Sequence, residues 1–153
     1  MTLAEVIKVV ERVASAQPDI NMIVRNDVFR INAAPSVKYG VFAWLQNQHR
    51  LEVENDYMHY SFTFFYVDRL TEDGSNEIEV QSTGITTLGN ILKRLDDLGV
   101  LTEDDYTFQT FNQRFLDVCA GVFCNVDLVV PVAVCAEDFP DIADGTDNDI
   151  LVY

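Results

Sequence analysis

The fold is decided by one stretch of the sequence, YMHYSFTFFYVDRL at residues 57–70. Aromatic side chains occupy every second position from Tyr60 to Tyr66. Successive side chains of a β-strand point to opposite faces of the sheet, so a period of two indicates a strand. We predict a long strand that turns one fully aromatic face to the core, while its other face becomes polar toward the start of the strand.

A second strand precedes this one along the chain. Val37 to Leu45 is also rich in aromatic and β-branched residues, which favour strands. The residues between the two segments, Gln46 to Asp56, are polar apart from Leu51 and Val53. We therefore expect two long antiparallel strands joined as a hairpin.

Two segments carry apolar side chains at three- and four-residue spacing, which predicts amphipathic helices. The first follows Thr2, which can cap it while Glu5 reciprocates, and it ends before Pro18. Its apolar positions are Leu3, Val6, Ile7, Val10, Val13 and Ala14. The second ends at Gly99, a residue that suits a helix C-terminus. Its apolar positions are Ile78, Ile85, Leu88, Ile91, Leu92, Leu95 and Leu98.

The start of the second helix is open to two interpretations. Thr71 to Asn76 contains the Asp-Gly pair that turns prefer, so the helix follows a turn. Gly84 and Gly89 weaken the helical pattern, and Glu77 to Gln81 is therefore either helical or extended.

The remaining segments predict further strands. Tyr106 to Phe111 is predicted as a short strand, and Phe115 to Val134 as one long strand or as two that break at Gly121 and Pro131. Ile20 to Arg30 is mixed in composition, and it is either a short strand or part of an arm.

The order helix, strands, helix, strands predicts an α+β fold, in which an antiparallel sheet with a long hairpin packs against two amphipathic helices in two layers. A chain of 153 residues has the size of one domain. We place this domain at residues 1–135 and an acidic C-terminal arm at residues 136–153. The arm has no Lys or Arg, and its carboxylates are Glu137, Asp138, Asp141, Asp144, Asp147 and Asp149.

The charge of the chain excludes several classes of partner. Acidic residues number 25 against 10 basic ones, which gives a formal net charge of −15 and opposes binding to nucleic-acid phosphates or anionic lipid. No apolar run approaches the ~20 residues that span a bilayer, and the first residues lack the basic start of a signal peptide. We expect a soluble protein without a membrane segment.

The residues that could carry chemistry are few and scattered. His49 and His59 have no cysteine near them at metal-ligand spacing, so surface or rim positions are expected. The cysteines are Cys119, Cys124 and Cys135. They lack CxxC spacing and a fixed histidine partner, which predicts reduced, buried thiols. Residues 144–149 resemble a calcium loop but lack its closing glutamate. We predict no enzyme, and no catalytic, metal or cofactor site.

Four short motifs are similar to one known family. They are Tyr66-Val67-Asp68-Arg69-Leu70, Gln81-Ser82-Thr83-Gly84, Phe111-Asn112-Gln113-Arg114-Phe115 and Cys119-Ala120-Gly121-Val122. Together they resemble the tail-completion or neck ring proteins of phages of gut Bacteroidota, including crAss-like phages, and the resemblance covers Leu3 to Val134. The order of elements is also similar to that of tail-terminator folds of long-tailed phages, which is a likeness of architecture.

The resemblance implies a structural virion protein that forms a six- or twelve-fold homo-oligomeric ring between portal and tail. Its implied partners are neighbouring portal, ring or tail proteins, and its implied place is the neck or tail of the virion after synthesis in the host bacterial cytoplasm. DNA would pass through the lumen without specific binding. A net charge of −15 suits that task, because an acidic lumen repels phosphates over a Debye length of ~8 Å.

Ring closure needs heterologous contacts, in which one patch meets a different patch on the neighbouring subunit. Exposed hairpin ends and arms suit such contacts, so we expect them in residues 46–56, in residues 19–35 and in the tail from residue 136. The charged residues expected at the interfaces are Arg50, Arg69, Arg114, Glu52, Glu54, Asp56, Asp138 and Asp141.

Two other classes of function compete with the ring subunit. An acidic protein-binding module that mimics DNA, or another phage accessory protein, also fits the charge. A DNA mimic needs carboxylates spaced along one face like phosphates, whereas here they gather in loops and in the tail. A small enzyme needs convergent polar groups, and the sequence offers few candidates for them.

Overall fold

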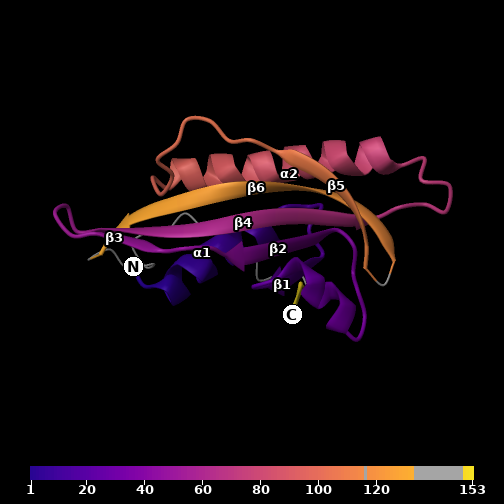
Figure 1. Ribbon diagram of the computed structural model, residues 1–153, viewed down its shortest axis with the longest axis horizontal. Helices are drawn as coiled ribbons and strands as arrows, with labels where there is room; N and C mark the ends of the chain where they lie inside the picture. The colour runs from indigo at the N-terminus through magenta and orange to yellow at the C-terminus, as the bar shows by residue number, and fades with distance from the viewer. Residues whose placement is uncertain (116, 133–149) are drawn as a thin grey trace.

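The computed structural model of the protein describes residues 1–115, 117–132 and 150–153 (Figure 1). The helices are α1 (Leu3–Ser15), the 3-10 helix η1 (Val28–Ala33) and α2 (Glu77–Asp97). The strands are β1 (Met22–Arg25), β2 (Val41–Gln46), β3 (Arg50–Glu52), β4 (Tyr57–Arg69), β5 (Gln109–Arg114), β6 (Val118–Pro131) and β7 (Leu151–Val152). Cys135, most of the predicted acidic arm and the predicted domain boundary lie outside the described residues.

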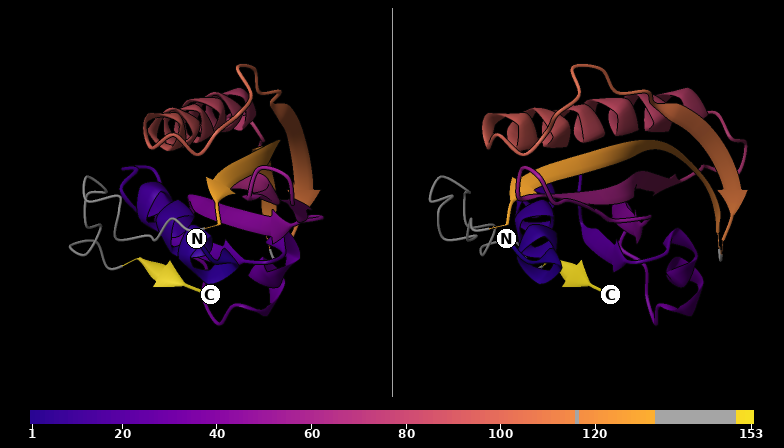
Figure 2. Two further views of the ribbon diagram at one scale, coloured as in Figure 1. Left: turned by 90° about the vertical axis from the view of Figure 1, so that its left-hand side faces the viewer. Right: turned by 60° about the vertical axis from the view of Figure 1, so that its left-hand side comes forward.

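The described strands form one sheet in the order β5-β6-β4-β2-β1-β7, and β3 pairs with β4 off this path. In the run β5-β6-β4-β2 each strand is antiparallel to its neighbour, while β1 lies parallel to both β2 and β7. The longest pairing joins β4 to β6, from Tyr57 opposite Pro131 to Arg69 opposite Cys119. Figure 2 shows that β6 is strongly curved and that β5 follows its bend. The predicted antiparallel hairpin is confirmed.

Both α-helices cover the same face of the sheet and share one core with it. The aromatic side chains predicted to face this core are all buried in it, namely Tyr60, Phe62, Phe64 and Tyr66. Trp44 of β2 meets Phe62 edge-on, with ring centroids 5.9 Å apart, a favoured arrangement for aromatic pairs. The predicted α+β class, with a sheet packed against two amphipathic helices, is confirmed.

Helix α1 is held at its start and at its middle. The Glu5 carboxylate accepts a hydrogen bond of 2.6 Å from the Thr2 backbone N–H, and the Thr2 hydroxyl accepts one from the Glu5 N–H, which completes the predicted capping box. Further along, the nearly buried Glu11 accepts two bonds of 2.6 Å from Arg25 of β1 and one of 3.1 Å from Trp44 of β2. This satisfied carboxylate ties α1 to two strands.

The opposite face of the sheet is covered at one end by η1. Val28 and Ile31 of η1 are buried there with Met22 and Val24 of β1 in a second apolar cluster. The prediction of a short strand in this segment is confirmed, and the alternative that Ile20 to Arg30 is part of an arm is wrong. The physical reason is that β1 lies between β2 and β7 and is apolar on both faces, as parallel strands usually are. The interface expected in residues 19–35 stays a prediction.

Helix α2 begins at Glu77, so the extended alternative for Glu77 to Gln81 is wrong. It ends at Asp97 with Leu98 as its C-cap, and Gly99 follows in the predicted C-terminal position with a φ of 72°. Its apolar stripe is less regular than expected, because Ile78 is 76% exposed. Val80 is buried instead. Because each residue turns the helix by about 100°, the side chain of Ile78, two positions before Val80, points to nearly the opposite side.

Three strand boundaries differ from the sequence prediction. β3 lies inside the stretch predicted as a polar connection, because its backbone pairs with the start of β4. β5 begins at Gln109 instead of Tyr106, and Phe115 lies between β5 and β6 instead of starting the next strand. β6 runs through Gly121 without a break and ends at Pro131.

Two glycines stand where neighbouring elements approach closely: Gly84 lies between α2 and β6, and Gly121 lies within the sheet. A Cβ atom on Gly84 of α2 would stand 2.9 Å from Val122 Cγ2 of β6. A Cβ atom on Gly121 would collide with the backbone carbonyl oxygen of Tyr66 and stand 2.6 Å from Phe111 Cζ. That carbonyl cannot move away without distorting the β4–β6 ladder, so position 121 accepts only glycine.

Replacing Gly121 by alanine is expected to lower the free energy of unfolding by about 2–3 kcal/mol, because the added methyl group overpacks a closed site. Gly89→Ala is the matched control: nothing lies within 4 Å of a Cβ atom there. Alanine is preferred to glycine inside a helix by ~1 kcal/mol, so this control should gain stability. Urea unfolding followed by circular dichroism measures both changes, and an unchanged midpoint for Gly121→Ala would contradict the packing described here.

Candidate interaction sites at the two ends of the sheet

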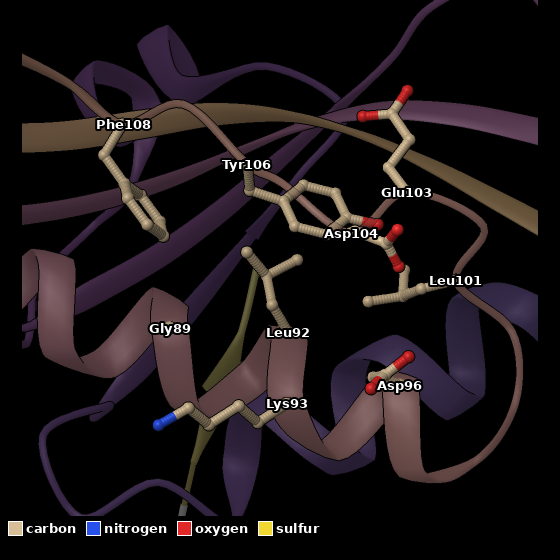
Figure 3. A pocket seen from close by; sticks show the side chains of 9 residues that line it. All are labelled: Gly89, Leu92, Lys93, Asp96, Leu101, Glu103, Asp104, Tyr106 and Phe108. Atoms are coloured by element: carbon tan, nitrogen blue, oxygen red, sulfur yellow. The ribbon is translucent and has the colours of Figure 1, made fainter.

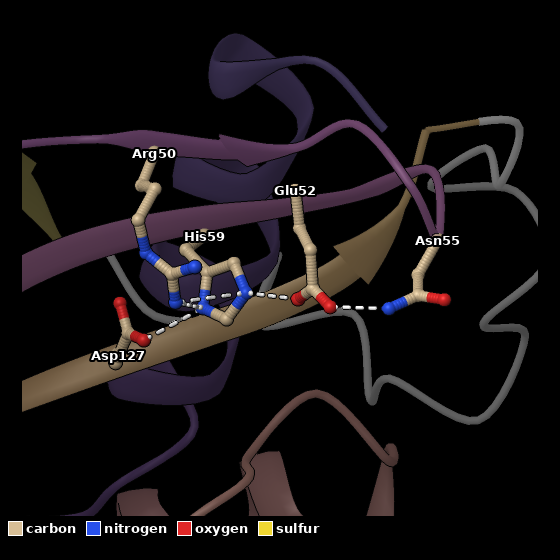
Figure 4. Close-up of polar contacts among 5 residues, drawn as sticks. All are labelled: Arg50, Glu52, Asn55, His59 and Asp127. Atoms are coloured by element: carbon tan, nitrogen blue, oxygen red, sulfur yellow. Dashed lines mark hydrogen bonds and ion pairs between the residues drawn. The ribbon is translucent and has the colours of Figure 1, made fainter.

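A polar cluster surrounds His59 near the β3–β4 hairpin (Figure 4). His59 is 9% exposed; its Nδ1 lies 2.9 Å from Asp127 Oδ2 of β6, and its Nε2 lies 3.1 Å from Glu52 Oε2 of β3. Arg50 Nη2 lies 3.0 and 3.1 Å from the two ring nitrogens. Strand pairing explains the arrangement, because β3 places Arg50 opposite His59.

The cluster joins β3 to the body of the sheet. Each ring nitrogen of His59 lies within hydrogen-bond distance of one carboxylate and of the Arg50 guanidinium. The pKa of Glu52 is lowered, first by the hydrogen bond from Asn55 and then by His59. The polar atoms of this cluster therefore bind mainly one another, and His59 is a buried residue instead of the surface or rim histidine that we expected.

Beyond this cluster the hairpin presents apolar and acidic side chains together. We call residues 51–57 with Val132 the hairpin tip; a backbone hydrogen bond of 2.9 Å from Val132 N–H to Asp56 O closes it. Its exposed apolar side chains are Leu51 at 52%, Val53 at 75%, Tyr57 at 39% and Val132 at 52%. Glu54 and Asp56 make no ion pair within the described residues. Exposed apolar groups at the end of a hairpin are typical of a contact surface.

A cavity of about 460 Å³ lies at the opposite end of β4. We call it the arginine cavity, and it is lined by Arg69, Leu70, Thr71, Glu72, Asp73, Gly74, Arg114, Asp117 and Val118. Arg69 Nη2 lies 3.5 Å from Asp117 Oδ1, and the Tyr39 hydroxyl donates to Asp117 Oδ2 at 2.7 Å. Burial, and then this bond, raise the pKa of Tyr39. Arg114 forms no ion pair within the described part of the chain.

The charged residues expected at interfaces thus separate into two groups. Arg50 and Glu52 bind His59 within the chain, while Glu54 and Asp56 lie at the hairpin tip. Arg69 and Arg114 come together at the other end, in one cavity. Asp138 and Asp141 lie outside the described residues. Sequence reasoning missed Asp127 and Asp117, whose partners are distant along the chain and share no local pattern with them.

A third feature is a cavity of about 290 Å³ between α2 and residues 101–108 (Figure 3). Three carboxylates and one amine line it, from Asp96, Glu103, Asp104 and Lys93. The Tyr106 hydroxyl is buried beside the Glu103 backbone without a hydrogen bond of good geometry, and burial raises the pKa of Tyr106 to about 12.

The two described cysteines are buried and free, as predicted. Cys124 belongs to the core under the helices, while Cys119 belongs to the cluster on the other face, in agreement with their odd spacing on one strand. Burial raises the pKa of Cys119 to about 11 and that of Cys124 to about 12. Within the described residues, no group of three His, Cys, Asp or Glu side chains could hold a metal ion.

No helix in the described residues has the length and the apolar content to span a bilayer. Neither a known protein family nor a curated protein sequence matches the chain. The two ends of the sheet, with their exposed apolar and charged side chains, are the surfaces best suited to interaction.

The buried thiols predict a specific alkaline instability. A thiol whose pKa is raised by folding contributes stability that is complete below its unfolded value of ~8.5 and is lost as pH rises toward its folded value. We expect stability to fall between about pH 8.5 and the folded values of about 11 and 12. A Cys119→Ala, Cys124→Ala double variant should have a shallower decline in urea-unfolding midpoint over this pH range, and an equal slope would contradict the assignment.

Proposed function

We propose that this protein is a structural subunit that assembles head to tail into a ring in the neck or tail of a phage, between portal and tail. The observation that carries the proposal is the presence of two chemically different contact surfaces at opposite ends of the sheet. One is the acidic and apolar hairpin tip, and the other is the arginine cavity. Contacts between unlike surfaces are heterologous, and they generate a closed ring when the rotation between subunits closes.

The distribution of exposed apolar side chains supports this proposal. Nine large apolar side chains are exposed among the described residues; four belong to the hairpin tip, and Val118 lines the arginine cavity. Scattered surface residues need no explanation, but a group of four at one end indicates a surface that another protein covers.

Charge supports a conduit for DNA. A net charge of −15 opposes adhesion of phosphates, and the ring would hold an acidic wall near the passing duplex. The same charge makes copies repel one another, so assembly requires local contacts where acidic groups meet basic ones. Arg114 offers a basic group for such a contact, in a cavity that it shares with Glu72, Asp73 and the Arg69–Asp117 pair.

The motifs that resemble neck ring and tail-completion proteins lie mainly in the scaffold. Tyr66 and Gly121 belong to the central strand pair, and Gly84 is the point where α2 approaches it. These residues support the assignment to a neck or tail ring through the shape of the subunit. Arg69 and Arg114, which stand within the same motifs, line the arginine cavity.

Assembly is tested by native mass spectrometry and negative-stain imaging of the purified protein, alone and with the portal and neck proteins of the same phage. We expect closed rings of six or twelve copies, alone or on the portal. A protein that stays strictly monomeric in every mixture would contradict the proposal. Salt-sensitive capture of a DNA-binding protein by that monomer would instead support the acidic DNA mimic.

A further inference from the structure

We infer that the cavity between α2 and residues 101–108 binds an organic cation, namely a guanidinium group on a short apolar stem (Figure 3). A free alkylguanidine and an arginine side chain of a partner protein share this chemistry. The cavity has no residue in common with the hairpin tip or the arginine cavity, and its use does not depend on ring assembly. Its lining, the space at Gly89 and the Tyr106 hydroxyl each indicate such a ligand.

The lining combines apolar surface with negative charge. The apolar members belong to the core or pack against it, and they are Leu92, Leu101, Tyr106 and Phe108. The charged members are Asp96, Glu103, Asp104 and Lys93. None of these four forms an ion pair in the described part of the chain. Three carboxylates against one amine favour a cation over a neutral or anionic ligand.

The arrangement of the carboxylates suits an extended cation. Within the described residues, no three His, Cys, Asp or Glu side chains stand close enough together to hold a metal ion. A guanidinium is planar and weakly hydrated, it has several N–H donors, and it stacks on aromatic rings such as those of Tyr106 and Phe108. Pockets for drug-sized ligands hold roughly 300–1,000 Å³, so a cavity of about 290 Å³ suits a group the size of one long side chain.

Gly89 leaves one wall of the cavity open. It lies inside α2, where glycine is less favourable than alanine. Close packing accounts for Gly84 and Gly121, where a Cβ atom would collide, but nothing lies within 4 Å of a Cβ atom on Gly89. The missing side chain therefore leaves a space that a group from outside the chain can fill.

The Tyr106 hydroxyl would gain a partner from such a ligand. Its oxygen is buried and has no hydrogen-bond partner among the described residues, which is unfavourable for a polar atom. Burial, and then the charge of Glu103, raise the pKa of Tyr106 to about 12, and Asp96 adds to this effect. After a small rotation of the ring, the oxygen would accept a hydrogen bond from a guanidinium N–H in the cavity.

Binding is tested by titrating the nitrogen-15-labelled full chain with butylguanidine and recording two-dimensional NMR spectra. We expect saturable shifts of the Gly89, Leu101 and Phe108 amide signals, with a Kd of about 1–10 mM for a ligand of this size. N-butylurea has nearly the same shape without the charge, and it should bind at least about fivefold more weakly. Butylamine should also bind more weakly, because an ammonium is more strongly hydrated than a guanidinium.

A variant that fills the cavity locates the site. Gly89→Leu should abolish binding, and it should fold because nothing lies within 4 Å of its Cβ atom. Asn90→Leu is the matched control, since it adds the same side chain at an exposed position of α2 outside the lining and should leave the Kd unchanged. Circular dichroism checks the folding of both variants.

Further variants test the charge and the hydroxyl. Asp96→Asn combined with Glu103→Gln should weaken binding of butylguanidine at least about fivefold. Glu79→Gln, which removes an exposed carboxylate of α2 outside the cavity, should have no effect. Tyr106→Phe should weaken binding about threefold without lowering the urea-unfolding midpoint of the free chain, because it removes a buried hydroxyl that has no partner. A residue that only packs would not separate these two measurements.

Arginine capped by amide groups at both ends distinguishes the two sources of the cation. If it binds at least as tightly as butylguanidine, the cavity admits a peptide backbone at its mouth and the ligand is an arginine of a partner protein. If only butylguanidine binds, the ligand is a free cation.

Three results would overturn the inference. They are the absence of saturable binding by butylguanidine and by capped arginine, binding that Gly89→Leu leaves unchanged, and equal binding of N-butylurea. The ring is measured separately by imaging and native mass spectrometry. A chain that forms rings without binding the cation would therefore overturn this inference alone, and a monomer that binds the cation would contradict only the proposed function.

Discussion

The antiparallel pairing of β4 with β6 is the constraint on which the rest of the structure depends. Every residue from Tyr57 to Arg69 has a partner on β6. Side chains alternate between the two faces, so a slip of one residue would turn the aromatic core face away from the helices. The close approach of Gly121 to the Tyr66 carbonyl helps to set this register, because a neighbouring residue with a side chain could not occupy that place. The helices then pack against the apolar face of this strand pair, and the neighbouring strands pair with its edges.

The length of this pair also separates the molecule into a middle and two ends. The middle is packed on the helix side with aromatic and aliphatic groups and with Cys124, a buried thiol whose pKa is raised by burial. The ends hold the exposed apolar side chains together with Glu54 and Asp56 on one side and Arg114 on the other. A subunit whose two ends differ chemically is suited to head-to-tail assembly. We therefore propose that the contacts between subunits form at these ends.

Two charged networks hold secondary elements at the margins of the core. Glu11 accepts hydrogen bonds from Arg25 and Trp44 and so fastens α1, while His59 lies between Glu52 and Asp127 and so fastens β3. Each network brings together residues far apart in the chain and satisfies most of its polar atoms, which offsets the cost of removing them from water. These networks are structural, whereas Glu54 and Asp56, at the end of the hairpin that contains β3, make no ion pair within the described residues.

Local patterns in the sequence determined the long strand with its aromatic face, the capped first helix and the end of α2 at Gly99. These features follow from interactions between residues a few positions apart, which the sequence displays directly. Only the tertiary structure decided the insertion of β1 parallel to β2, the presence of β3 and the partner of each charge. Nothing local distinguishes Arg50, which binds His59, from Arg114, which meets no carboxylate in the described residues. Their surroundings come from strands that pair across long stretches of chain, and such contacts have no fixed spacing in sequence.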